Sequence, residues 1–236
     1  MKHVIHKLKD FALFLPDFGR IEGGERGKTP YASIKKEETM KLIESKTYLN
    51  LAKAFAGECM ARTRYEFIEY GARQQGYTAL AEVIDKIVYN EFNHARMCYT
   101  YLQSASEKTI ANVDVASGYP FKEKWDLVEN LRLAAEDEGI EAEKVYPEYQ
   151  KTAEEEGFQD IAGLFRNLIG IETCHKKLFT DLYEQMKSGT LYKKNEATKW
   201  KCGGCGYEWT KKEAFEICPV CGAKQGVVLL KLSDGE

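Results

Sequence analysis

The chain has 236 residues, of which 30% are charged and 44% are hydrophobic, and its formal net charge is −3. This is the composition of an ordinary globular protein, long enough for one large domain or two smaller ones. The small negative charge provides no general attraction to nucleic acid or to an anionic membrane, and no apolar run approaches the roughly 20 residues of a membrane-spanning helix. We therefore expect neither nucleic acid nor a membrane as a partner.

The amino-terminal residues 1–36 combine basic residues with glycines and prolines, and they predict an irregular extension. Its simplest role is a packing arm or a contact between subunits. The apolar stretch FALFL has some likeness to a signal peptide, but it is short and is interrupted by Pro16 and Asp17. We expect the chain to be uncleaved and to remain in the cytoplasm.

After the extension, the spacing of apolar residues becomes helical. Gly76, Gly157 and Gly189 lie at predicted helix ends, and a long segment with Gly118 and Pro120 separates the second helix from the third. Two helical hairpins joined by one long connection predict a ferritin-like four-helix bundle. The four helices are predicted over residues 38–75, 78–106, 121–157 and 158–188.

Two histidines each follow a glutamate by three residues, as Glu91 with His94 and Glu172 with His175. At this spacing both side chains lie on one face of a helix, one turn apart. A single pair of this kind is more often a solvated surface pair, but here both pairs lie on faces that are otherwise apolar and predicted to point inward. The other residues of these faces are Ile84, Ile87, Ala95 and Cys98 for the first pair, and Leu164, Leu168, Phe179 and Leu182 for the second.

The other two helices also carry glutamates on apolar faces, namely Glu58 on the first helix and Glu138 and Glu141 on the third. Together with the two E-x-x-H glutamates, five carboxylates are predicted to be buried, and each would cost several kcal/mol if it stayed ionised without a partner. No lysine or arginine recurs on these faces, so the carboxylates must be protonated or bind metal, and we favour metal. The apolar residues that surround them are Leu51, Ala54, Ala61, Tyr65, Leu131, Ala134, Ala135, Ala142 and Val145.

The spacing of the glutamates repeats between the two hairpins. Glu58 and Glu91 are 33 residues apart, and Glu138 and Glu172 are 34 residues apart. Each hairpin thus supplies one glutamate and one E-x-x-H motif, which is the known arrangement of ferritin-like di-iron proteins. Oxygen-rich ligands with two imidazoles suit iron or manganese better than zinc or copper, and two such cations offset the charge of the carboxylates.

The carboxyl-terminal part begins with a polar stretch over residues 190–201, which predicts a linker, and it ends with the short β-type run VVLLKL. Between them lie two C-x-x-C pairs separated by twelve residues, Cys202 with Cys205 and Cys218 with Cys221. Two such turns form a tetrahedral cage of four thiolates. Zinc and iron both accept this cage, and the spacing by itself slightly favours a zinc ribbon.

Three further cysteines, Cys59, Cys98 and Cys174, are scattered through the predicted helices, where we expect them to be small core residues. An odd total of seven cysteines, four of them in metal-binding pairs, argues against a secreted disulfide scaffold. It favours a reducing compartment in which thiolates hold metal.

Taken together, these motifs resemble the rubrerythrin family over about residues 45–232, and every ligand position of the family pattern is filled. The resemblance implies a ferritin-like di-iron domain over residues 37–190 and a rubredoxin-like iron domain over 191–236. The extension over residues 1–36 departs from the shorter family pattern. It reverses the preference for zinc and implies three irons per chain. The matching segments are AFAGECMARTRY, YNEFNHAR, DEGIEAEKVYPEY, IETCHKK, ATKWKCGGCGYEW and EICPVCG.

The resemblance implies a peroxidase that reduces hydrogen peroxide to water in defence against oxidative stress, with electrons relayed through the rubredoxin-type iron. It further implies that one iron exchanges Glu141 for His94 between redox states, and that Tyr65 and Tyr146 bond to ligand carboxylates, although core packing is an alternative for both tyrosines. We expect a reductase or rubredoxin-type protein as electron donor, and a homodimer or homotetramer. The implied bundle ligands are Glu58, Glu91, His94, Glu138, Glu141, Glu172 and His175.

Two other functions remain open at this point. Iron storage or ferroxidase chemistry fits the same bundle, but it leaves the thiolate cage without an obvious role and requires a hollow shell of subunits. A zinc ribbon on a helical scaffold would serve nucleic-acid or protein binding. Residues 199–236 carry no dense basic face with interleaved aromatic residues, which weakens the second alternative.

Overall fold

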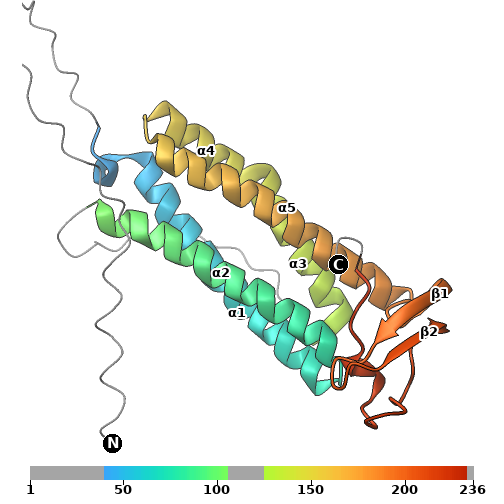
Figure 1. The fold of residues 1–236 in the computed structure, drawn as a ribbon. Coiled ribbons are helices and arrows are strands. Elements are labelled where there is room, and N and C mark those ends of the chain that lie inside the picture. The colour runs from blue at the N-terminus through green and yellow to red at the C-terminus, as the bar shows by residue number, and fades with distance from the viewer. Residues whose placement is uncertain (1–39, 106–124, 233–236) are drawn as a thin grey trace, which may run out of the picture. The chain divides into compact units, whose positions relative to one another are not determined.

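The computed structural model describes residues 40–105 and 125–232. Within these ranges the chain forms the predicted four-helix bundle followed by a small β module (Figure 1). The extension over residues 1–36 and most of the long connection lie outside the described residues. No described helix is both long and apolar enough to cross a membrane. The α-helices are α1 (Lys46–Gln74), α2 (Thr78–Ser104), α3 (Leu127–Ile140), α4 (Tyr146–Glu155) and α5 (Gln159–Lys187).

The first helix begins at Lys46, later than the predicted residue 38, because two capping groups define its start. The hydroxyl oxygen of Ser45 accepts a hydrogen bond from the backbone N–H of Tyr48 at 3.0 Å. Glu156, in the turn between α4 and α5, accepts hydrogen bonds from the backbone N–H groups of Lys46 and Thr47 at 3.0 and 2.8 Å. The backbone N–H groups in the first turn of a helix have no partner within the helix, and the oxygens of Ser45 and Glu156 accept hydrogen bonds from three of them. The carboxylate of Glu156 also interacts favourably with the helix dipole.

Replacing Glu156 by glutamine tests how much these hydrogen bonds stabilise the start of α1. Burial opposes the ionised form, but the hydrogen bonds from Thr47 and Lys46 keep the pKa of Glu156 below its usual value of 4.5. A folded-state pKa below the unfolded one means that the stabilisation is complete above the unfolded pKa and is lost as the pH falls through the folded pKa. We expect Glu156→Gln to lower the free energy of unfolding by about 1 kcal/mol at pH 7. In urea titrations this difference should shrink below about pH 4.

The neighbouring exposed residue supplies the control for this measurement. Within residues 40–105 and 125–232, Glu155 makes only an exposed i,i+4 ion pair with Lys151, at 3.8 Å. Pairs of this kind contribute little to stability. Glu155→Gln should therefore unfold like the wild type at both pH values. Equal effects of the two substitutions would show that the contacts of Glu156 do not stabilise the start of α1.

The third predicted helix is not continuous, which corrects the prediction of a single helix over 121–157. A five-residue π-helix, Glu141–Val145, separates α3 from α4. Pro147 follows it at the start of α4, and a proline has no N–H to bond to the carbonyl four residues earlier and crowds that carbonyl. A π-turn widens the helix by one residue and is frequent at functional sites.

The predicted helix ends are confirmed, and the core is divided in two. Gly76, Gly157 and Gly189 follow the helix ends with positive φ, which a glycine adopts without strain. One apolar cluster, which includes Ile84 and Phe179, lies toward the end of the bundle where α1 turns into α2. A second cluster, which includes Phe165, lies toward the opposite end. A layer of buried polar residues separates the two clusters along the helices.

The β module contradicts the predicted linker over residues 190–201. Strand β1 (Lys193–Lys201) pairs antiparallel with β2 (Glu208–Glu213). The only side chain of β1 that is buried is Trp200, whose indole N–H donates to the carbonyl of Lys211 at 3.0 Å. Because nearly all its other side chains are polar, the strand shows no apolar alternation in the sequence. The run VVLLKL is also not a strand, since it starts at the end of a 3-10 helix, Gln225–Val227, and then forms a single antiparallel bridge between Val228 and Cys202.

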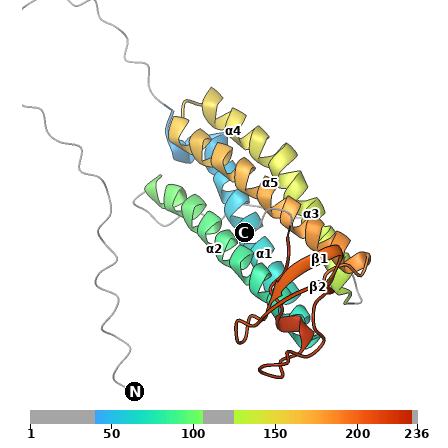
Figure 2. The same ribbon diagram turned by 45° about the vertical axis from the view of Figure 1, so that its right-hand side comes forward.

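The β module packs against the end of the bundle where α1 turns into α2 (Figures 1 and 2). A Cβ atom on Gly226 would lie 1.6 Å from the carbonyl oxygen of Gly76, so the two backbones are in direct contact. Gln185 on α5 donates to the carbonyl of Lys231 at 3.0 Å and accepts from the amino group of Lys194 at 2.6 Å. Leu230 and Leu232 also pack against the apolar cluster at this end of the bundle.

Candidate metal centres

Six polar side chains meet in the layer between the two apolar clusters, and all are at most 7% exposed. They form two groups of four, within which the nearest ligand atoms all lie within 4.8 Å of one another. Both groups contain Glu91 from α2 and Glu172 from α5. The first group adds Glu58 and His94, and the second adds Glu138 and His175. Two neighbouring positions that share two carboxylates are the geometry of a paired metal centre.

The shared carboxylates each face both imidazoles. The two oxygens of Glu91 lie 3.1 Å from Nδ1 of His94 and 3.0 Å from Nδ1 of His175. Those of Glu172 lie 3.2 and 2.8 Å from the same two nitrogens. One oxygen of each carboxylate thus points to each position. This arrangement suits a carboxylate that bridges two cations.

The two remaining carboxylates each belong to one position and are held by a tyrosine from the opposite hairpin. The Tyr146 hydroxyl donates to Oε1 of Glu58, and the Tyr65 hydroxyl donates to Oε1 of Glu138. Oε2 of Glu58 lies 3.5 Å from Nδ1 of His94, and Oε2 of Glu138 lies 3.8 Å from Nδ1 of His175. Each tyrosine therefore fixes one oxygen and leaves the other directed into the site.

The donor atoms of this layer fit metal ions. The buried atoms without a hydrogen-bond partner include Oε2 of Glu58, Oε2 of Glu138 and both oxygens of Glu172. Buried polar atoms normally have partners, and a shared space lined by such acceptors calls for cations or protons. Burial raises the pKa of Glu138 to about 8. Against the effect of burial, hydrogen bonds to glutamates raise the pKa of His175 to about 12. Without cations the layer holds protons, and metal binding would displace them.

Glu141 lies beside the two groups and belongs to neither. It is the first residue of the π-helix, and its carboxylate oxygen lies 3.8 Å from where a Cβ atom on Gly57 would be. Burial raises its pKa, and the nearby charges of Glu58 and Glu138 raise it further. Glu141 is thus close to the site, and its role as a ligand stays a prediction.

The π-helix explains the unequal spacings in the sequence. Tyr65 follows Glu58 by seven residues, whereas Tyr146 follows Glu138 by eight. Seven residues are close to two turns of an α-helix, so eight residues place the tyrosine on the same face only if the helix is widened by one residue. The π-turn adds this residue, and the same insertion accounts for the separation of 34 residues in the second hairpin compared with 33 in the first.

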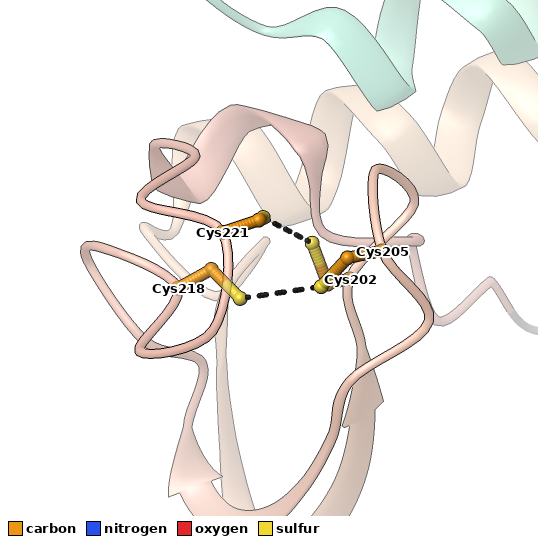
Figure 3. A group of neighbouring side chains, drawn as sticks. All are labelled: Cys202, Cys205, Cys218 and Cys221. Atoms are coloured by element: carbon orange, nitrogen blue, oxygen red, sulfur yellow. Dashed lines mark hydrogen bonds between the residues drawn. The ribbon is translucent and has the colours of Figure 1, made fainter.

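The four cysteines of the β module gather into one cage (Figure 3). The sulfur atoms of Cys202 and Cys221 are 3.8 Å apart, and those of Cys205 and Cys218 are 3.6 Å apart. A tetrahedral metal with bonds of about 2.3 Å to sulfur requires sulfur–sulfur distances of about 3.8 Å. The cage therefore has the size that a tetrahedral metal requires.

The two turns that carry the cysteines have the same backbone structure. The N–H of the glycine after each pair, Gly206 and Gly222, donates to the carbonyl of the first cysteine of that pair at 2.9 Å. Burial opposes the thiolate of Cys218, but the backbone N–H groups of Cys221 and Val220 lower its pKa to about 7. These N–H groups thus stabilise the thiolate form of Cys218, which is the form that binds a metal.

The other predicted cysteine positions are only partly correct. Cys98 is buried as expected, whereas Cys59 is half-buried and Cys174 is exposed. Cys174 directly precedes His175 on α5, and adjacent helical residues point about 100° apart, so it cannot share the inward face. Sequence reasoning also missed Asn90, whose side chain lies 3.2 Å from Nε2 of His175. An exposed asparagine on a polar helical face carries no signal of such a contact.

Comparisons with known proteins agree with both centres. Residues 50–189 match the family described as Rubrerythrin, and residues 200–226 match the rubredoxin-like domain of rubrerythrin. The chain is 38% identical to rubrerythrin of Clostridium perfringens over 177 residues, which cover 75% of this chain and 90% of that protein. It is 35% identical to rubrerythrin of Porphyromonas gingivalis over 195 residues, or 82% and 94% of the two chains.

A solved structure of nigerythrin in a mixed-valence state has the same fold, with a TM-score of 0.52 at 22% identity. That match covers 88% of this chain and all of the other. The matched families decide the question of the metal that spacing left open at the thiolate cage, in favour of iron. The chain therefore belongs to the rubrerythrin family of oxidoreductases, and its two domains fit three iron ions, two in the bundle and one on the four thiolates.

Proposed function

We propose that this protein is a peroxidase that reduces hydrogen peroxide to water and thereby protects against oxidative stress. The observation that carries the proposal is the pair of shared carboxylates, Glu91 and Glu172, each of which faces both imidazoles. Two ferrous ions held side by side would supply the two electrons that cleavage of one O–O bond requires. Hydrogen peroxide then takes up two electrons and two protons and leaves as two water molecules.

The residues of the chain have distinct proposed roles in this reaction. Tyr65 and Tyr146 hold the outer carboxylates by hydrogen bonds, so these keep one oxygen directed inward when the charge at the site changes. The apolar clusters on both sides of the layer limit the access of water, which strengthens electrostatic interactions inside it. The proposed bundle ligands are Glu58, Glu91, His94, Glu138, Glu141, Glu172 and His175, and the proposed cage ligands are Cys202, Cys205, Cys218 and Cys221.

The position of the β module bears on how electrons reach the bundle. The module contacts the start of α2, and Glu91 lies 13 residues beyond Thr78 on that helix. At 1.5 Å per residue, this is a path of about 20 Å along the bundle. Electron transfer slows steeply with distance, so a cage from a second copy that lies nearer to the site would be the better relay. This reasoning supports the proposal of a homodimer or homotetramer that receives electrons from a reductase or a rubredoxin-type protein.

We also propose the division into an extension over residues 1–36, a di-iron domain over 37–190 and a rubredoxin-like domain over 191–236. The cytoplasm is the proposed location. None of the seven cysteines is in a disulfide, and four thiolates that hold iron require reducing surroundings.

The test is metal analysis combined with a reaction followed by absorbance. We expect three irons per chain and a red thiolate-iron spectrum that bleaches on chemical reduction. Three equivalents of hydrogen peroxide per two chains, which take up the six electrons of six ferrous ions, should then oxidise the reduced protein faster than dissolved dioxygen does. A reduced spectrum that peroxide leaves unchanged would contradict the proposal.

The same experiment separates the alternative functions. Iron storage predicts many more irons than three per chain and a large shell in native mass spectrometry. A binding scaffold predicts zinc on the four thiolates and no change of the spectrum with reductant or peroxide.

A further inference from the structure

The two histidines of the bundle site differ in what their outer ring nitrogens contact. The side-chain amide of Asn90 on α2 lies 3.2 Å from Nε2 of His175 on α5. Within the described residues, Nε2 of His94 has no corresponding hydrogen bond. The contact also crosses from the first hairpin to the second, although Asn90 directly precedes Glu91 in the chain. It therefore connects the two halves of the site at one of its two positions.

An asparagine side chain suits both states of this histidine. Nδ1 of His175 faces the carboxylates, so a metal bound there leaves the ring proton on Nε2. In the structure the amide nitrogen of Asn90 faces Nε2 and donates to it when Nε2 carries no proton. After a half-turn of the amide, its oxygen accepts from Nε2–H. A hydrogen bond to the outer nitrogen fixes the orientation of a ligand histidine and makes the ring a stronger ligand.

We propose that Asn90 is a positioning residue that fixes His175 as a permanent ligand and makes the two metal positions unequal. His175 is held from both sides, by the carboxylates at Nδ1 and by Asn90 at Nε2. Among the residues that the structure describes, His94 is held only at Nδ1, so its ring turns more easily. The inference rests on the proposed metal centre and goes beyond it, because it assigns a cause for a difference between two positions that are otherwise built alike.

The neighbouring asparagine provides a matched comparison. Asn93 lies three residues further along α2, and the hydrogen bonds of its side chain to described residues all lie within its own helix. It donates to the carbonyl of Tyr89 at 2.9 Å and accepts from the guanidinium group of Arg96 at 3.4 Å. Replacing Asn93 therefore shows what the loss of an asparagine side chain on α2 does to metal binding when no hydrogen bond to a histidine is removed.

The experiment uses the full-length protein, stripped of metal and titrated with zinc, which is diamagnetic and allows histidine ring signals to be observed by NMR. In the wild type we expect a slowly exchanging ring proton on Nε2 of His175. Asn90→Leu should lose this signal and weaken one of the two bundle sites for zinc by roughly 10- to 100-fold. Asn90→Asp should retain the signal and the affinity, because its carboxylate also accepts from Nε2–H. Asn93→Leu should behave like the wild type.

The possible outcomes are distinct. If Asn90→Leu matches Asn93→Leu in both signal and affinity, Asn90 is only a surface residue and the inference is wrong. It is also wrong if Asn90→Asp fails in the same way as Asn90→Leu, or if both bundle sites weaken equally, since the hydrogen bond would then not be the cause. If the wild-type bundle itself takes up no zinc, the proposed metal centre fails, which is a different result.

Discussion

Replacing Glu172 by glutamine is expected to remove both metal ions from the bundle while leaving the ion on the thiolate cage in place. Glu172 belongs to both groups of ligands, and its two oxygens lie 3.2 and 2.8 Å from the two imidazoles. Glutamine has nearly the same shape, but it carries no charge and offers only one oxygen. One of the two positions then faces an N–H₂ group, which cannot bind a cation, and the whole layer loses one negative charge.

The size of this effect follows from the shared role of the residue. Loss of a group that only supports a ligand commonly costs 10- to 100-fold in metal affinity or activity, and loss of a bridging ligand affects two ions at once. We expect iron to fall from three to about one per chain, and peroxide turnover to fall at least 100-fold. Iron analysis and the rate of peroxide consumption measure the two effects. The red spectrum of the cage should remain, because its four cysteines lie in a different part of the chain.

A glutamate elsewhere on α5 is the control for this substitution. Glu184 is exposed near the end of the helix and belongs to neither group of ligands. Glu184→Gln should keep three irons and full turnover. A Glu172→Gln protein that also keeps three irons would show that the carboxylate does not bridge the two positions, and the proposed centre would have to be abandoned.

The second large effect is expected from Gly226→Ala, which should separate the β module from the bundle without dismantling the cage. A Cβ atom at this position would lie 1.6 Å from the carbonyl oxygen and 2.8 Å from the carbonyl carbon of Gly76. These are backbone atoms in a tight turn between two long helices, so they cannot move aside as the end of a flexible side chain would. The module must shift instead.

The consequences should appear in stability and in exchange of backbone protons. Overpacking of a close contact typically costs about 1–3 kcal/mol, and we expect a loss of this size in the free energy of unfolding. Hydrogen exchange at the amides of residues 76–78 and at the Lys231 end of the module should accelerate. The cage spectrum should stay unchanged, because the hydrogen bonds of Gly206 and Gly222 that shape the two turns lie within the module.

Gly163→Ala is the matched control for this substitution. Gly163 lies within α5, and a Cβ atom there would meet nothing within 4 Å. Alanine is the better helix former, so this change should be neutral or slightly stabilising. If Gly226→Ala unfolds and exchanges like Gly163→Ala, the backbone contact does not hold the module against the bundle.

The sequence by itself was sufficient to predict the bundle, the thiolate cage and the inward orientation of most of the site. An apolar face with a helical period shows which side of a helix is buried, and a glutamate or histidine on that face stands out as a group that needs a partner. Glu58, Glu91 and Glu138 are predictable in this way, and all three are at most 1% exposed. The thiolate cage is easier to predict than the bundle site, because each of its two turns is formed by residues that are neighbours in the sequence.

The predictions for two elements, β1 and the start of α1, were wrong because the residues of these elements carry no pattern that indicates their structure. The polar side chains of residues 190–201 predict a linker, whereas pairing with β2 makes Lys193–Lys201 a strand. The start of α1 depends on Glu156, which is 110 residues from Lys46 in the chain. No periodicity within α1 contains that information.

Only the tertiary structure decided how the predicted ligands divide between two positions. The sequence treats the glutamates as equivalent, whereas the packing of four helices makes Glu91 and Glu172 shared and leaves Glu58 and Glu138 each at one position. The π-turn that compensates for one extra residue, the tyrosines that reach across to the opposite hairpin, and the contact of Asn90 with His175 likewise appear only in three dimensions. The physical reason is that burial is a property of one helix face and can be read from its period, whereas a distance between atoms of different helices depends on how the helices pack.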